Sequence, residues 1–141
     1  MTRIFLDANV LISVVNQELP LFTFSSRILS LVDDSRFEVY TSPLCLAITY
    51  YFSEKKSGSK LANKKLRILS ERLNITTVNP DCVTASVNNP KVSDFEDGLQ
   101  YYSTVASGCE MIITENQKDF YFSEITVTDC EGFFVNHLKN K

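Results

Sequence analysis

The sequence predicts an α/β protein with a central, mainly parallel sheet of about five strands. Short apolar and β-branched runs alternate with longer segments whose apolar residues recur at helical spacing, which is typical of βαβ units. The 141 residues suit a single domain over 1–141, and a chain of that length can bury a core without disulfides. Because 44% of the residues are hydrophobic and 22% are charged, the composition is that of a globular protein.

The first third of the chain is expected to contain two strands. Residues 3–6 form an apolar run that predicts a buried strand, and residues 21–32 carry apolar side chains near helical spacing. Residues 37–41 alternate in polarity and predict a second strand. Ser42 followed by Pro43 is typical of a helix N-terminus, so a long helix is expected to begin there.

The middle of the chain predicts two further helices and a third strand. The helix after Pro43 should end near Lys56, where Ser-Gly-Ser interrupts the pattern. Ser59 can cap a second helix, and the β-branched residues at 75–78 predict a strand. Asn79-Pro80 is typical of the start of a short helix.

The last third predicts two capped helices and two strands. Ser93 and Glu96 match a capping box, in which Ser93 caps a helix that Gly108 ends. The remaining expected elements are strands at 111–114 and 125–127, and a last helix that begins with a second capping box at 128–131.

Several classes of protein are excluded by composition. No apolar run approaches the roughly 18 residues that a membrane helix needs, and the first residues do not resemble a secretory signal. We therefore expect a cytoplasmic protein without membrane association and with reduced cysteines, of which Cys45 and Cys109 lie among apolar neighbours and are expected in the core. The four cysteines have no C-x-x-C spacing, and His137 is the only histidine, so a zinc or multi-histidine site is not expected.

Charge is distributed unevenly along the chain. Residues 55–72 contain seven Lys or Arg and one acid, whereas residues 92–131 contain nine acids and one base. The basic stretch is suited to phosphates and the acidic stretch to divalent cations. Two solvated faces are the simpler explanation of the same pattern.

Acids follow the predicted strands where an open parallel sheet places its working site. Asp7 follows the first strand, Asp119 follows the fourth, and Asp94, Glu96 and Asp97 begin the helix between them. Each has an ordinary alternative, as a helix cap, a turn residue or a partner of the helix dipole. Acids that converge on one sheet edge repel one another, and this repulsion suits a site for Mg²⁺ or Mn²⁺. Without metal, at least one of them should have a raised pKa, Asp7 above all.

Three segments resemble the motifs of PIN domains, the family named after the PilT N-terminus. FLDANVLI at 5–12 is similar to the opening D-x-N-x-[LI] motif. The segment 97–114 is similar to the D-x-x-x-A-A…G-x-x-x-[IV]-[IV]-T stretch, and TENQKDF at 114–120 resembles T-R-[ND]-x-x-D-F. Order and spacing agree over the whole chain, which makes the resemblance more specific than D-x-N alone.

The resemblance implies a fold, an activity and partners. The fold would be a three-layer α/β/α sandwich. The activity would be that of an Mg²⁺- or Mn²⁺-dependent ribonuclease, most often the toxin of a bacterial toxin–antitoxin pair and often dimeric. The partners expected on this basis are RNA, a cognate antitoxin protein and a second copy of the chain.

The resemblance also assigns site residues. Asp7 matches the first metal carboxylate of the family and Asp97 the third. The fourth position corresponds to Asn116 or Asp119, of which only Asp119 carries charge. Polar positions that orient the acids correspond to Asn9 and Thr114, for which a helix cap and a strand-end hydroxyl are the alternatives.

Two positions depart from the family pattern. Ile48 stands where the second acid belongs, and Glu115 replaces the motif arginine. Asp94 or Glu96 could restore the lost negative charge, because both begin the helix that carries Asp97. If they do not, metal binding is weak and the nuclease is poor.

The predicted function is therefore RNA cleavage at a metal held by three aspartates. The basic helix would contact phosphates through Lys64, Lys65 and Arg67, unless it is only a solvated face. The alternative function is a degenerate PIN domain that binds RNA or protein without cutting. A phosphoacceptor receiver module is a more distant third, because no lysine follows a late strand.

Overall fold

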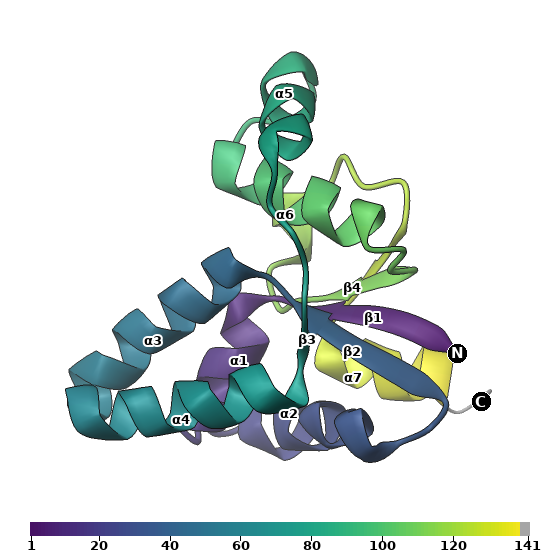
Figure 1. Ribbon diagram of the computed structural model, residues 1–141. Coiled ribbons are helices and arrows are strands. Elements are labelled where there is room, and N and C mark those ends of the chain that lie inside the picture. The colour runs from purple at the N-terminus through teal and green to yellow at the C-terminus, as the bar shows by residue number, and fades with distance from the viewer. Residues whose placement is uncertain (139–141) are drawn as a thin grey trace.

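A computed structural model describes residues 1–138, and it contains one five-stranded sheet (Figure 1). Every strand pairs in parallel with its neighbours, in the order β3-β2-β1-β4-β5. The strands are β1 (Thr2–Leu6), β2 (Phe37–Thr41), β3 (Asn74–Ile75), β4 (Met111–Ile113) and β5 (Thr126–Thr128). The predicted α/β class and its parallel sheet of five strands are confirmed.

The order of the strands places a topological switch between β1 and β4. From β1 the chain crosses to β2 and β3 on one side, then returns to β4 and β5 on the other. Adjacent strands whose connections leave in opposite directions open a crevice at their carboxyl ends. The register pairs Leu6 with Ile113, so the residues that follow these two strands meet at that crevice.

Helices cover both faces of the sheet, as the sandwich requires. In Figure 1, α5 and α6 lie on one side of the strands, and α1, α2 and α7 on the other. The helices are α1 (Ala8–Val15), α2 (Phe22–Leu29), α3 (Pro43–Ser57), α4 (Ser59–Arg72), α5 (Pro80–Asn88), α6 (Phe95–Ala106) and α7 (Cys130–Phe133). Short 3₁₀ turns form η1 (Ser30–Asp33) and η2 (Gln117–Phe120), and η3 (Phe134–Leu138) is a π-helix.

Several predicted helix boundaries are confirmed by their side-chain contacts. The Ser42 hydroxyl accepts a hydrogen bond from the Cys45 amide at the start of α3, and Asn79 caps α5 in the same manner. Gly108 follows α6 in a left-handed conformation, with φ of 78°, which ends the helix as expected.

The predicted caps of three helices are wrong. Asp94, not Ser93, caps α6, and Asp129 rather than Thr128 caps α7. In both cases an aspartate one residue nearer to the helix accepts from the amide three positions on, so the expected capping boxes do not form. Ser59 is the first residue of α4 and not its cap, because Gly58 makes the turn from α3 with a φ of 84°.

The third strand is shorter than predicted. It comprises only two residues at the edge of the sheet, although the Thr76 amide still donates to the Thr41 carbonyl at 2.8 Å. Beyond that point the Thr76 hydroxyl contacts Ser103 of α6, and the chain leaves the sheet for α5. β2 itself ends at Thr41, the partner of Ile75, so it offers no further strand residues for pairing.

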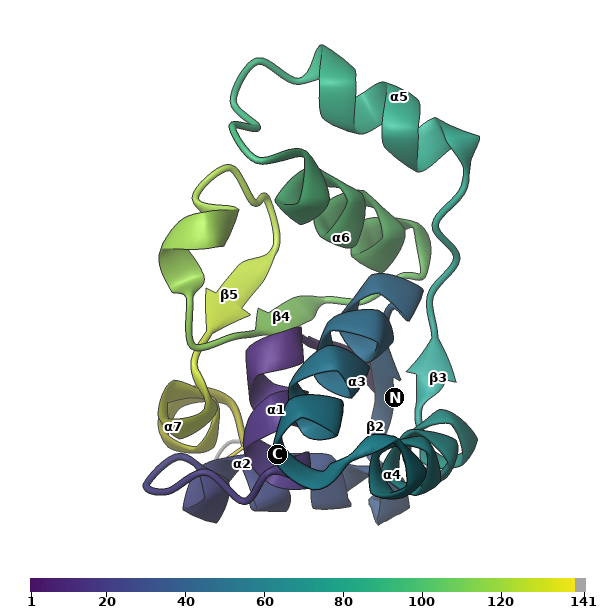
Figure 2. The same ribbon diagram turned by 90° about the vertical axis from the view of Figure 1, so that its left-hand side faces the viewer.

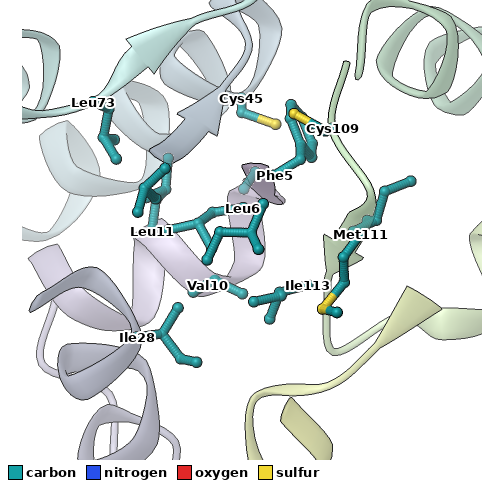
Figure 3. Packing of buried hydrophobic residues seen from close by; sticks show 14 of the residues in the cluster. Phe5, Leu6, Val10, Leu11, Ile28, Cys45, Leu73, Cys109, Met111 and Ile113 are labelled. Atoms are coloured by element: carbon teal, nitrogen blue, oxygen red, sulfur yellow. The ribbon is translucent and has the colours of Figure 1, made fainter. Parts of the chain in front are cut away.

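The core is centred on β1. Ile4, Phe5 and Leu6 are all fully buried, as expected for the middle strand of a sheet that is covered on both faces. Figure 3 shows Phe5 and Leu6 among side chains from α1, α2 and β4. Within residues 1–138 no helix is both long and apolar enough to span a membrane. All four cysteines are unpaired and buried, which confirms the core positions of Cys45 and Cys109.

Candidate active site

Asp7 stands at the carboxyl end of β1 and caps α1. Its Oδ1 accepts a 2.8 Å hydrogen bond from the Ala8 amide, one of the free amides of the first turn. Its Oδ2 accepts a 2.8 Å hydrogen bond from the Thr114 hydroxyl at the end of β4. The two residues that follow the switch strands are therefore in direct contact. Figure 2 shows α1, α3 and α6 around this edge of the sheet.

Asn9 and Thr114 complete a polar network around Asp7. Asn9 Nδ2 donates to Thr114 Oγ1 at 3.0 Å and to Asp7 Oδ2 at 3.4 Å, while its Oδ1 accepts from the Glu115 amide at 3.1 Å. Asn116 joins through its backbone, whose N–H donates to Thr114 Oγ1 at 3.0 Å. These contacts fix the plane of the Asp7 carboxylate and the position of the loop after β4.

Cys45 is a neighbour of Asp7 that the sequence did not single out for the site. Its Sγ lies 3.6 Å from Asp7 Oδ1, within the range of a thiol hydrogen bond. Burial, and then the charge of Asp7, raises the pKa of the Cys45 thiol to about 12, so the thiol stays protonated and can donate. The only signal in the sequence is its place one turn after the cap Ser42, which turns it toward the end of β1.

Asp97 lies in the first turn of α6, where acids from three segments affect its pKa. Burial is the largest cause that raises the pKa of Asp97, followed by the negative charges of Asp119, Asp94, Asp7 and Glu96. Together they raise this pKa from 3.8 to about 7. Because such charge effects weaken with distance and with salt, the acids lie within interaction range of one another.

The pKa of Asp7 is also raised, as the sequence predicts. Burial is again the main cause, and it outweighs the hydrogen bonds from Thr114, Ala8 and Cys45, which favour the charged form. The charge of Asp119 raises it further. Two of the three predicted aspartates are therefore held under conditions that penalise their negative charge.

The other acids of the site are exposed. Asp119 lies in η2, which buries the neighbouring Phe120 and so anchors the acid at the rim. Asp94 is engaged in capping, because its Oδ1 accepts from the Asp97 amide at 3.2 Å. Glu96 contributes its charge from the outer side of the same helical turn.

No positive side chain forms an ion pair with these acids within the described residues. The three ion pairs there, Arg3–Glu38, Arg36–Asp34 and Arg72–Asp33, lie elsewhere. Nor do three His, Cys, Asp or Glu side chains of residues 1–138 come close enough to hold one ion by themselves. Mg²⁺ commonly keeps several waters and takes one or two carboxylates, so an oxygen-only, water-rich site fits this donor set.

The two departures from the family pattern have clear structural consequences. Ile48 lies on α3 one turn after Cys45 and is half-buried against the core, so it adds no ligand at that wall of the site. Glu115 accepts a 2.9 Å hydrogen bond from the Cys130 amide through Oε2. Its carboxylate therefore caps the first turn of α7.

The basic helix is only partly available to a ligand. Lys64 and Arg67 are exposed on α4, but the Lys65 ammonium donates to the Val15 carbonyl at 2.5 Å. Lys56 makes a similar contact with the Asn16 carbonyl. Both ammonium groups thus donate to carbonyls at the end of α1, and the phosphate contacts of Lys64, Lys65 and Arg67 stay a prediction.

A parallel α/β sandwich with acids at this switch point is the architecture of a PIN domain. The profile of the PIN domain family matches residues 3–118, and the chain belongs to that family. A relative from Aquifex aeolicus, Ribonuclease VapC1, is 26% identical over 139 residues, which are 93% of this chain and 92% of the relative.

Solved structures share the fold. The VapBC-1 structure from nontypeable Haemophilus influenzae has a TM-score of 0.69 at 16% identity, covering 92% of this chain and 99% of that one. The Rickettsia felis VapBC2 structure, bound to a promoter DNA fragment, has a TM-score of 0.67 at 17% identity and covers 91% and 98%. Mycobacterium tuberculosis VapC20, described as a toxin that cleaves the Sarcin-Ricin loop, has a TM-score of 0.61 at 17% identity and covers 77% and 86%.

Proposed function

We propose that this PIN domain is a divalent-metal-dependent endoribonuclease and the toxin of a bacterial toxin–antitoxin pair. The observation that carries the proposal is the convergence of Asp7, Asp97 and Asp119, from three segments, at the switch between β1 and β4. Crowded acids without a positive partner are unfavourable unless a cation joins them. Their position beyond the strand ends is where an open parallel sheet binds its ligands.

Mg²⁺ or Mn²⁺ fits this group of oxygen ligands. Asp7, Asp97 and Asp119 would hold the cation partly through bound waters, because no three acids of residues 1–138 lie close enough to bind one ion directly. Asp94 and Glu96 add negative charge from the turn that carries Asp97. When bound, such a cation supplies a water of lowered pKa and a positive charge for phosphoryl oxygens.

The other residues of the site orient the acids. Thr114 and Asn9 hold Asp7 Oδ2, and the Ala8 amide and Cys45 thiol hold Oδ1, so this carboxylate cannot rotate freely. A carboxylate held in advance loses less entropy when it binds a ligand. The exposed Lys64 and Arg67 would contact phosphates further along the RNA.

The relatives support the biological assignment. Ribonuclease VapC1 carries its activity in its name, and VapC20 is described as a toxin that cleaves the Sarcin-Ricin loop. Two fold neighbours are VapBC assemblies, which favours a protein antitoxin as partner of this chain. A homodimer is part of the same proposal.

Cleavage of single-stranded RNA during titration with Mg²⁺ or Mn²⁺ tests the activity. Asp97→Asn should abolish cleavage, because it removes an acid from the cation site. Asp81→Asn is a matched control: Asp81 is an exposed acid in the first turn of α5, outside the site. Metal-independent cleavage that survives Asp97→Asn would refute the proposed site.

The alternative is a PIN domain that binds RNA or protein without cutting it. The observation that favours it is the half-buried Ile48, an apolar residue one turn from Cys45 where the family pattern has an acid. In that case the wild type would bind RNA or a partner but show no cleavage at any metal concentration.

A further inference from the structure

An aromatic hollow lies beside the candidate active site. It encloses about 500 Å³ between the loop before α6, α6 itself and residues 121–124, which follow η2. Figures 1 and 2 both show these segments side by side at one end of the molecule. None of the residues that line it belongs to the group of acids described above.

Both walls of the hollow continue from elements that carry acids of the site. Asp97 is in the first turn of α6, and Tyr101 and Val105 of the hollow lie one and two turns further along, which is about 6 and 12 Å at 1.5 Å per residue. On the other wall, Tyr121 and Phe122 come two and three residues after Asp119, beyond the buried Phe120. A chain held at the acids can therefore reach the hollow.

The hollow is lined by aromatic rings in edge-to-face contact. Tyr101 and Phe122 lie 5.1 Å apart at 77°, and Tyr121 and Phe122 lie 5.5 Å apart at 90°. Tyr102 meets Tyr101 at 5.1 Å and 79°. Such contacts fix the rings in place. Tyr101 and Phe122 are buried, whereas Tyr121 is 60% exposed and is held at its hydroxyl by the Lys91 carbonyl, so Tyr121 is the ring that a flat ligand can reach.

Polar groups with unused hydrogen-bonding capacity border the rings. The Tyr102 hydroxyl accepts from Asn89 Nδ2, and the Tyr101 hydroxyl accepts from the Glu124 amide, both at 3.0 Å. Each hydroxyl accepts in these contacts, so its own hydrogen remains able to donate. The side chains of Lys91 and Glu124 are exposed and belong to none of the ion pairs found in residues 1–138.

We propose that the aromatic hollow binds one base of the RNA next to the bond that is cut. A nucleobase is flat, stacks on aromatic rings and carries both donors and acceptors, which matches the rings, hydroxyls, ammonium and carboxylate found there. The Lys91 ammonium can also contact the adjoining phosphate. This inference rests on the proposed nuclease function for the position of the base along the RNA.

Two tryptophan substitutions provide a blocked hollow and a matched control. Val105→Trp places a large ring at the mouth of the hollow, from an exposed helical position. Val87→Trp makes the same change on α5, at a residue that is 64% exposed and does not line the hollow. Because both valines are exposed, neither variant should lose its fold.

Binding is measured first without metal or cleavage. The four ribonucleoside 5′-monophosphates at millimolar concentration should shift the NMR signals of the Tyr101, Tyr102, Tyr121 and Phe122 rings, whereas ribose 5-phosphate should not. Affinity should fall about 10-fold or more in Val105→Trp, as expected when stacking is lost, and stay unchanged in Val87→Trp. Ring signals that no nucleotide moves would overturn the inference.

Cleavage then places the base along the RNA. An RNA with one abasic position beside the cleaved bond should be cut about 10-fold more slowly than the intact RNA by the wild type. Val105→Trp should cut both RNAs at the same reduced rate. Cleavage without ring shifts would refute the base-binding hollow and leave the nuclease standing, whereas ring shifts without cleavage would refute the nuclease and leave a nucleotide-binding hollow.

Discussion

Asp97→Asn should make the protein more stable at neutral pH while it removes the activity. The Asp97 carboxylate is partly buried and lies near four other acids, and both effects raise its pKa by penalising its charged form, burial most of all. Asparagine has nearly the same shape and no charge, and no hydrogen bond of the Asp97 carboxylate is found within residues 1–138. The substitution therefore relieves repulsion without breaking a contact of the side chain.

The size of the effect follows from the difference between the folded and unfolded pKa. Taken at full value, the difference between 3.8 and about 7 corresponds to about 4 kcal/mol. Because Asp97 is partly exposed, solvent screening reduces this to about 1–2 kcal/mol. A gain of this size raises the melting temperature of a domain of this length by about 3–8 °C.

The sign of the pH dependence is fixed by the direction of the shift. Below about pH 4, Asp97 is protonated in both states, so wild type and variant should be equally stable. Between about pH 4 and 7, the unfolded chain loses this proton while the folded protein retains it, so the free energy of unfolding of the wild type falls. Above pH 7 the wild type has lost all of this contribution to its free energy of unfolding, and the stability difference in favour of Asp97→Asn is largest.

Thermal unfolding from pH 4 to 8 in metal-free buffer, with circular dichroism as the readout, measures the difference. Asp81→Asn is again the control, since it loses one charge from a first helical turn and should become slightly less stable, by about 0.3–1 kcal/mol. Mn²⁺ should stabilise the wild type more than Asp97→Asn, because an intact site binds it better. An Asp97→Asn protein that is no more stable than Asp81→Asn at pH 7.5 would refute the crowding of the acids.

The remaining predictions concern the walls of the site. Ile48→Glu should raise the cleavage rate or lower the Mn²⁺ concentration needed, because position 48 lies one turn from Cys45, which contacts Asp7. Ala47→Glu, on the exposed side of α3, should do neither, and equal effects of the two variants would place Ile48 outside the site. Thr114→Val should lower the free energy of unfolding in urea by about 1–3 kcal/mol, since Asp7 Oδ2 and Asn9 Nδ2 each lose a hydrogen bond to the buried hydroxyl. Thr114→Ser should restore most of this loss, and equal stability of the two variants would show that the hydroxyl is not needed. Gly98→Ala should destabilise the protein by about 1–3 kcal/mol and reduce cleavage. The added Cβ would lie 2.8 Å from Ser86 Oγ and 2.9 Å from Val92 Cγ1, and would push α6 away from α5. An unchanged midpoint of urea unfolding would contradict this close packing.

Local patterns were sufficient to predict most of the secondary structure. The alternation of β-branched runs with helical spacing predicted the parallel sheet, and Ser42-Pro43 and Asn79-Pro80 predicted two helix starts. These features depend on residues that are close together in the sequence, so local patterns are enough to predict them. The wrong caps at Ser93 and Thr128 are of another kind, because an aspartate with equal capping ability stands beside each of them and only the backbone path selects between the two.

The candidate site divides in the same way between local and long-range information. The acids themselves follow from the sequence, since Asp7 and Asp119 come after predicted strands and Asp97 opens a helix. The strand order then brings Asp7 against Thr114, 107 positions apart, and the turn of α3 brings Cys45 to the same carboxylate. These contacts depend on which strands pair and in which register, and that choice is made by burial of the whole core around β1. For the same reason, only the tertiary structure could show that the Lys65 ammonium donates to the Val15 carbonyl at the end of α1.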